Sequence, residues 1–377
     1  MNPFLNRLSC ILDKSRSFDN SNAVFSNNSM SWQKWLKLNN DHLPAIAFCF
    51  VSKKNFLGGR FIPLFNEMQK LRIVVFRGTM FGKFDLIILK LMRLFVKLTY
   101  RKQKNYKWVM TLGSNSIHSS INQILNIDDP QYNDSELKNI LEWEKKLHIA
   151  GAKSMLVTTN MFTKKYFQRS NVSSPIHIIE QGHTSIRRRA LTKNLNFSCA
   201  YSSPYIDIPG DKHGNHPTWG SELFVNEIIP KLIARDSEIE IHVVGRVGKR
   251  AFEHLRNFSQ VKLYGPKNNI DNFEIISKCH VGLYPRLFDN YRRILKVYEY
   301  LGAGIPVVTF ELEDTRMVSE KNIGVSVKTV TEFIGTVIEL KYNKELYNEL
   351  ISNVNNCGDD NSWANLGIKY DKLIQDS

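Results

Sequence analysis

The sequence predicts an α/β protein with two doubly wound domains. Short apolar runs rich in β-branched residues alternate with helical patterns, which is typical of parallel sheets covered on both faces. These runs form two series, separated by the polar, basic segment 184–196. A length of 377 residues also fits about two domains. We therefore expect two Rossmann-like domains, residues 1–190 and 191–377, that face each other across a cleft, with the last helix packing back on the first domain.

Each series can be followed along the chain. In the first half, the predicted strands are 45–51, 71–77, 107–112, 124–128, 154–158 and 177–180. In the second half, they are 197–201, 240–245, 261–265, 281–284, 306–310 and 324–327. Helical patterns lie between the later strands, among them SELFVNEIIPKLIAR at 221–235 and DNFEIISKC at 271–279. In such sheets, ligands bind beyond the carboxyl ends of the strands, so the predicted cleft is the expected binding region.

The composition narrows the class of protein. Apolar residues make up 42% and charged residues 23% of the chain, which excludes a mainly disordered protein. The five cysteines are scattered and form no CxxC pair, so neither a zinc site of the usual spacing nor a thioredoxin-like site is expected. Free thiols fit a reducing cytoplasm. The N-terminus has no signal-peptide pattern because Arg7 and Asp13 interrupt it.

The basic charge of the chain points to an anionic partner. Lys and Arg exceed Asp and Glu by 51 to 36, a net charge of +15. About half of this excess lies in residues 83–107, where cations three and four residues apart share one helical face. One interpretation is an interfacial helix on an anionic membrane surface, and the alternative is a core helix with a solvated basic face. The cations rule out a spanning helix here, so any membrane attachment would be peripheral.

Several common motifs are absent. No GxGxxG follows the first strand, and Gly245–Arg250 lacks the spacing of a phosphate-binding loop. There is no GxSxG nucleophile elbow and no HExxH. We therefore expect no metal and no resident cofactor, and any phosphate must be bound in another way.

The most informative stretch is 281–310, VGLYPRLFDNYRRILKVYEYLGAGIPVVTF. Arg292, Lys296 and Glu299 are spaced four and three apart, so they share one face of a helix. Two cations near a helix N-terminus suit an anion, and a carboxylate one turn later can accept hydrogen bonds from vicinal hydroxyls such as those of a ribose. Taken alone, this pattern also fits a solvated face on which Glu299 pairs with Lys296.

This stretch resembles the C-terminal half of GT-B glycosyltransferases of the family 4 type. The resemblance rests on Lys296-Val-Tyr-Glu299, the small-residue turn and Pro306-Val-Val, together with EIHVVGR, VKLYGPKNN and the SW-containing end of the chain. It covers roughly residues 197–377. It implies the GT-B fold and transfer of a sugar from a nucleoside diphosphate sugar, UDP- or GDP-linked.

The resemblance also implies roles for individual residues. Lys296, supported by Arg292 and Arg246, would neutralise the departing diphosphate. Gly245 would let the backbone approach the phosphates, and Glu299 would hold the ribose. The family often has a second glutamate eight positions earlier, where this chain has Tyr291, and Asp289 or Asn290 could replace it. Lys212 is a further candidate cation.

The N-terminal half offers a candidate general base. Asp128 and Asp129 directly follow an apolar strand, so a carboxylate there could face the cleft and deprotonate an acceptor hydroxyl. The alternative is a turn, which Asp-Pro commonly provides. His118 and His183 also follow strands and could line the cleft, but an ordinary loop histidine is the favoured interpretation of each.

The sequence thus predicts a cytoplasmic glycosyltransferase that acts in cell-surface polysaccharide synthesis. Its expected partners are a nucleotide sugar, a glycan or lipid-linked glycan acceptor, and an anionic membrane surface contacted by residues 83–107. One rival is a nucleotide-sugar epimerase of similar fold. Another is a non-catalytic, basic nucleic-acid-binding protein, against which the basic stretch shows few interleaved aromatics and no recognition motif. We expect no specific nucleic-acid partner.

Overall fold

The structure of the protein is a computed structural model. It describes residues 29–31, 43, 45–51, 68–69, 71–77, 108–112, 122–127, 134–180, 182–183, 193–212, 220–267, 269–288, 294–357 and 360–377. Contacts divide the chain into an N-terminal unit, Met1–Glu180 with Trp363–Ser377, and a C-terminal unit, Gln181–Ser362. The first boundary between the two units therefore follows Glu180, about ten residues before the boundary at residue 190 that the sequence predicts. Most of the intervening basic segment lies outside the described residues.

The N-terminal unit contains a seven-stranded sheet in which all pairs are parallel. Its spatial order is β1-β3-β2-β4-β5-β6-β7. The strands are β1 (Ser29–Ser31), β2 (Ala45–Val51), β3 (Leu71–Arg77), β4 (Trp108–Leu112), β5 (Asn122–Ile127), β6 (Ser154–Thr158) and β7 (Ile176–Ile178). The described helices are α5 (Asp134–Ile149), α6 (Met161–Arg169) and α15 (Trp363–Asp376).

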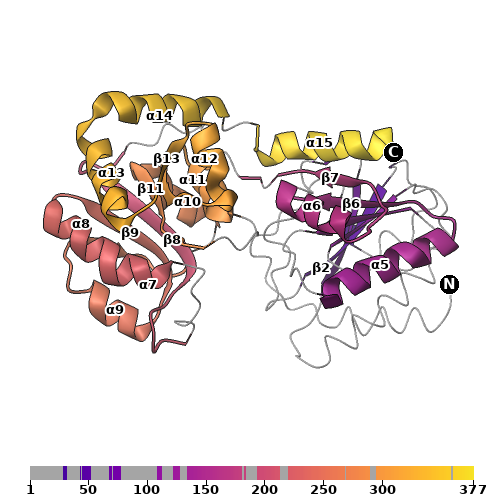
Figure 1. Ribbon diagram of the computed structural model, residues 1–377, viewed down its shortest axis with the longest axis horizontal. Coiled ribbons are helices and arrows are strands. Elements are labelled where there is room, and N and C mark those ends of the chain that lie inside the picture. The colour runs from indigo at the N-terminus through magenta and orange to yellow at the C-terminus, as the bar shows by residue number, and fades with distance from the viewer. Residues whose placement is uncertain are drawn as a thin grey trace. The chain divides into compact units, whose positions relative to one another are not determined.

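Successive side chains of β5 and β6 point to opposite faces of this sheet, and a separate hydrophobic core packs on each face. Leu125 and Leu156 pack in one core together with side chains of α5 and α6. Ile124 and Met155, one position earlier on the same strands, pack in the other core with α15. Buried strands with apolar residues on both sides need cover on both faces, and α15 supplies part of it from the end of the chain (Figure 1).

The C-terminal unit contains a six-stranded parallel sheet of order β10-β9-β8-β11-β12-β13. The strands are β8 (Ser198–Ile206), β9 (Glu240–Val247), β10 (Val261–Leu263), β11 (Val281–Tyr284), β12 (Val307–Phe310) and β13 (Gly324–Val327). The helices are α7 (Ser221–Leu223), which continues through a π-helical turn (Phe224–Ile228) into α8 (Ile229–Arg235), α9 (Lys249–Leu255), α10 (Asn269–Lys278), α11 (Leu295–Gly302), α12 (Arg316–Glu320), α13 (Val330–Tyr342) and α14 (Lys344–Cys357). A short 3₁₀ turn, Glu313–Thr315, precedes α12.

Two cores sandwich the second sheet (Figure 1). Helices α7–α8, α9 and α13 contribute to one core, and α10, α11 and α12 to the other. Local signals set several boundaries: Thr329 and Glu332 form a capping box at the start of α13, and Asn160 caps α6 by accepting a hydrogen bond from Thr163 N. The π-helical turn ends two residues before Pro230, which has no N–H to donate to the preceding turn. The predicted parallel α/β architecture is confirmed.

Candidate functional site

The strand order of the C-terminal unit defines where a ligand can bind. Successive strands run outward from β8 in one direction as β9 and β10, and the chain then crosses to β11, β12 and β13 on the other side. Neighbouring strands β8 and β11 therefore flank the topological switch point, beyond whose carboxyl ends open α/β sheets bind ligands. The two strands pair only at Val281 with Cys199 and at Gly282 with Ala200. Past these pairs the strands separate.

Tyr300 of α11 fills the point of separation. Its buried hydroxyl accepts a hydrogen bond from Ser202 N of β8 and donates one to Leu283 O of β11, each over 3.1 Å. Burial raises the pKa of Tyr300 well above its ordinary value, so the hydroxyl keeps the proton that it donates. The ring lies over Gly282, where a Cβ atom would come within 2.4 Å of it. Tyr300 thereby fixes α11 over the switch point.

Lys296 and Glu299, on the same helix, meet above Ser202. Lys296 Nζ lies 2.6 Å from Glu299 Oε2 and donates to Ser202 Oγ over 3.2 Å. Asn272 of α10 joins them, since its Nδ2 donates to Glu299 Oε2 over 3.4 Å and its Oδ1 accepts from Ser202 Oγ over 3.2 Å. The side chains of Lys296 and Glu299 remain 22% and 25% exposed. A cation and a carboxylate thus reach solvent side by side at the switch point.

Arg246 adds a second cation on the neighbouring strand. It is exposed near the end of β9, and its guanidinium lies 5.7 Å from the centre of the Tyr205 ring. The preceding Gly245 has a φ of +144°, and a Cβ atom there would come within 1.8 Å of Ser203 O. Only glycine can occupy this position, where β9 closely approaches the irregular part of β8. Gly245 therefore fixes the backbone position of Arg246.

The N-terminus of α9, which follows Arg246, is already occupied by a carboxylate. Asp211 accepts hydrogen bonds from Arg250 N and Ala251 N at 2.9 and 3.1 Å, and from Ile208 N. Burial would raise the pKa of Asp211, but these backbone donors outweigh it and lower the pKa. The positive end of α9 is therefore neutralised by a carboxylate of the chain itself.

Of the remaining predicted site residues, some are described by the structure and others are not. Arg292, Asp128 and Asp129 lie outside the described residues, as do Asp289–Tyr291, His118 and the basic segment 83–107. Lys212 is described and exposed, whereas His183 is buried at 2% exposure.

The sequence reasoning missed Ser202, Asn272 and Tyr300. Their residue types carry no motif, and they meet only because β8, α10 and α11 converge at the switch point. One signal was present: a glycine inside the apolar strand 281–284 is unusual and indicates that a bulky group packs on it.

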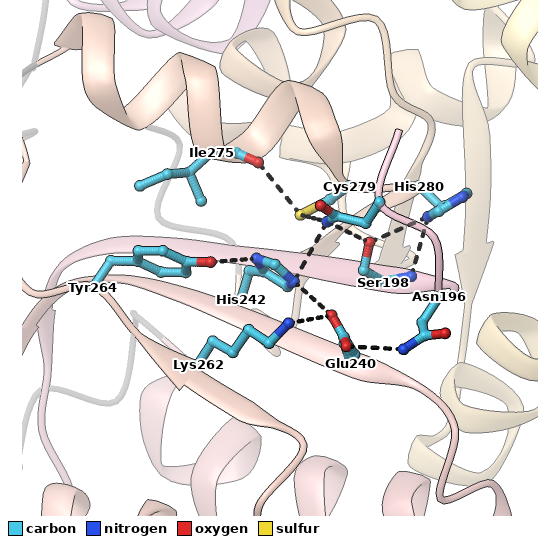
Figure 2. Close-up of polar contacts among 10 residues, drawn as sticks. Asn196, Ser198, Glu240, His242, Lys262, Tyr264, Ile275, Cys279 and His280 are labelled. Carbon is cyan, nitrogen blue, oxygen red and sulfur yellow. Dashed lines mark hydrogen bonds and ion pairs between the residues drawn. The ribbon is translucent and has the colours of Figure 1, made fainter. Parts of the chain in front are cut away.

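A second polar cluster lies at the amino ends of the same strands (Figure 2). His242 binds Tyr264 Oη through Nδ1 at 2.9 Å and Glu240 Oε2 through Nε2 at 3.3 Å, and His280 Nδ1 accepts from Ser198 N at 3.1 Å. Burial first, then the nearby Lys193, lowers the pKa of His280 to about 4. Strand amino ends lie away from the switch point, so this cluster ties strands together rather than facing the ligand.

No described helix has the length and apolar character needed to cross a membrane. Among the described residues, no group of three or more His, Cys, Asp or Glu side chains is arranged to hold a metal ion.

A known protein family matches the part of the chain that holds most of this site. Residues 213–343 match the family described as Glycosyl transferases group 1. This range includes Gly245, Arg246, Asn272, Lys296 and Glu299. This part of the chain is therefore similar to group 1 glycosyltransferases. No curated protein sequence matches the chain.

Solved glycosyltransferase structures share the fold. S. aureus TarM aligns with a TM-score of 0.53 at 13% identity over 71% of this chain, which spans 55% of TarM. WaaG, a glycosyltransferase involved in lipopolysaccharide biosynthesis, aligns with a TM-score of 0.58 at 12% identity, covering 88% of this chain and 100% of WaaG. Anabaena HepE, solved with UDP, gives a TM-score of 0.61 at 10% identity with the same coverages.

A candidate UDP-N-acetylglucosamine 2-epimerase from Listeria monocytogenes also aligns, with a TM-score of 0.53 at 10% identity over 87% of this chain and 95% of its own. At these identities the structural likenesses establish the fold, which is that of the GT-B enzymes.

Proposed function

We propose that this GT-B glycosyltransferase moves a sugar from a nucleoside diphosphate sugar to a glycan or a lipid-linked glycan. The observation that carries the proposal is the Lys296–Glu299 pair at the switch point, with Arg246 on the adjacent strand. Transfer leaves negative charge on the departing diphosphate, and fixed cations stabilise that charge. Lys296 uses two of its three N–H groups on Ser202 and Glu299, so one remains for a phosphate oxygen.

The nucleoside is the second element of the proposal. Glu299 is an acceptor beside the phosphate-binding cation, which suits the hydroxyls of a ribose. HepE has been solved with UDP and with UDP-glucose, and TarM with UDP, so UDP is the first nucleotide to test and GDP the second.

The acceptor side of the proposal comes from the sequence. Asp128 or Asp129 would deprotonate the acceptor hydroxyl, and the basic segment 83–107 would hold the enzyme at the cytoplasmic face of an anionic membrane, where cell-surface polysaccharide is made. WaaG acts in lipopolysaccharide biosynthesis, which supports a lipid-linked glycan as the class of acceptor.

A thermal-shift panel with UDP, GDP, CDP, ADP, TDP and NAD tests the donor site. At a concentration of about 100 times its Kd, one nucleoside diphosphate should raise the Tm of the wild type by roughly 5 °C. The Lys296→Ala substitution should abolish this rise. Lys231→Ala is the matched control, because Lys231 also pairs with a glutamate on its own helix, at 2.7 Å, but lies on α8. An equal rise in Lys296→Ala would contradict the assignment.

The epimerase of similar fold is the second candidate, supported by the structural likeness above. The fate of the sugar separates the two activities. A transferase releases the nucleoside diphosphate and places labelled sugar on an acceptor, whereas an epimerase returns an isomeric sugar still bound to the nucleotide.

A further inference from the structure

Four side chains at the switch point form a closed ring of hydrogen bonds. Lys296 donates to Ser202, Ser202 donates to Asn272, Asn272 donates to Glu299, and Glu299 accepts from Lys296 to complete the ring. Ser202 and Asn272 are buried, at 5% and 8% exposure. The ring therefore has a buried half, which is fixed, and an exposed half, which can meet a ligand.

The ring divides the two oxygens of the Glu299 carboxylate. Both donors, Lys296 Nζ and Asn272 Nδ2, contact Oε2. Within the described part of the chain, no side chain donates to Oε1. The carboxylate is thus anchored through Oε2, and Oε1 keeps its capacity to accept hydrogen bonds in a side chain that is 25% exposed.

Lys296 is a poor sole anchor for that carboxylate. It is the cation assigned to the diphosphate, and its ammonium lies at the end of a flexible side chain, so it can shift towards the phosphates that its third N–H group binds. Asn272 has no such second partner in the ligand, since it is neutral, buried and held by Ser202. Its amide suits this place because it accepts from Ser202 on one side and donates to Glu299 on the other, which an aspartate cannot do.

We infer that Asn272 is a positioning residue that holds Glu299 with Oε1 directed at the ribose hydroxyls of the donor nucleotide. This inference rests on the proposed function, since it assumes a nucleoside diphosphate on α11. Asn272 acts through Glu299 and does not touch the ligand. Its loss should therefore affect recognition of the ribose and leave recognition of the diphosphate intact.

The experiment measures binding of UDP, 2′-deoxy-UDP, 3′-deoxy-UDP and pyrophosphate by calorimetry. The wild type should bind UDP roughly tenfold more tightly than at least one deoxy form, as expected for loss of a hydrogen bond to a charged acceptor. Asn272→Ala should weaken UDP binding by a similar factor and bring the ratio near one. Its affinity for pyrophosphate should change by less than about twofold, because the cations are untouched.

Two further variants make the result specific. Asn257→Ala is the matched control, since Asn257 is an exposed asparagine whose Nδ2 donates to Glu253 O outside the site. Glu299→Gln should lose the ribose preference as Asn272→Ala does. If Asn272→Ala keeps the wild-type ratio while Glu299→Gln loses it, Asn272 does not position the carboxylate and the inference is overturned.

Two other outcomes also decide the matter. If Asn272→Ala weakens the binding of UDP, both deoxy forms and pyrophosphate equally, the substitution damages the site as a whole. That outcome would overturn the inference about Asn272 but not the proposed donor site. If the wild type binds none of UDP, GDP, CDP, ADP and TDP, the proposed donor site fails and the inference fails with it.

Discussion

At the scale of single residues, the most consequential side chain is Tyr300, which no ligand needs to touch. Its hydroxyl is the partner of Ser202 N and Leu283 O where β8 and β11 separate. Without it, a buried donor and a buried acceptor would each lack this partner, and α11 would lose its attachment above the sheet. The position of Lys296 and Glu299 thus depends on Tyr300, which directly follows Glu299 and lies one turn after Lys296.

Replacing Tyr300 by Phe tests this role, because the ring is kept and only the hydroxyl is lost. We expect Tyr300→Phe to lower the free energy of unfolding of the C-terminal unit by about 1–3 kcal/mol. Native-state hydrogen exchange in β8 and β11 measures it. The matched control is Tyr342→Phe, since Tyr342 is 65% exposed and donates to Asp236 at 3.0 Å, and it should cost less than about 0.5 kcal/mol. An equal loss of unfolding free energy in the two variants would contradict the role of the Tyr300 hydroxyl in joining β8 and β11.

The same scale shows how far the sequence could predict the site. The helical spacing of Lys296 and Glu299 is local, and their predicted common face agrees with their 2.6 Å contact. Ser202 and Asn272 are 70 residues apart and joined by a hydrogen bond. Such a contact depends on how strands are ordered in the sheet, and no residue spacing encodes that order.

At the scale of elements, predicted strands agree with the structure wherever a simple apolar run defines them. The ranges 45–51, 71–77, 154–158, 281–284 and 324–327 coincide with β2, β3, β6, β11 and β13. The prediction for β8 stopped at Tyr201, but the strand continues to Ile206 through a register shift between Ser202 and Tyr205. Pro204 lies in this irregular part. In a sequence, a proline usually indicates the end of a strand, although a bulge can accommodate it within the strand.

The amino-end cluster gives the C-terminal sheet a predictable response to acid. Burial, followed by the positive Lys193 and His242, lowers the pKa of His280 to about 4 from 6.5. Between these values the unfolded chain binds a proton that the folded chain does not, so stability is fully present above pH 6.5 and falls as the pH drops towards 4. Hydrogen bonding by Lys262 lowers the pKa of Glu240 to about 2, so its contribution is lost only at still lower pH, from about 4.5 downward.

We therefore expect His280→Asn to reduce the loss of stability between pH 6.5 and 4, while His242, whose pKa is also lowered by burial, keeps its own contribution to that loss. Asparagine offers an acceptor for Ser198 N without a titrating group. Hydrogen exchange of β8 and β11 at pH 7, 5.5 and 4.5, corrected for the intrinsic rate, gives the profile. The same substitution at His148, exposed at the end of α5 in the other unit, is the control. An unchanged profile in His280→Asn would assign the acid response to other groups.

At the scale of the whole molecule, the end of the chain belongs to the unit that contains its beginning. Leu366, Tyr370 and Ile374 of α15 are buried in one core with Trp108 and Ile124. Asp371 adds a polar contact, accepting from Gln69 N at 2.7 Å. The N-terminal unit is therefore completed only after the C-terminal unit has been synthesised.

This arrangement predicts where a mutation near the chain end acts. Ile374→Ala should remove a buried side chain, 2% exposed, and cost about 2–4 kcal/mol of unfolding free energy. The loss should appear as faster hydrogen exchange in β4, β5 and β6, while β8, β9 and β12 keep their protection, although they are nearer to α15 in the sequence. Ile368→Ala, on the exposed face of the same helix at 64% exposure, should leave both units unchanged. Faster exchange confined to the C-terminal sheet would show that α15 stabilises that unit instead.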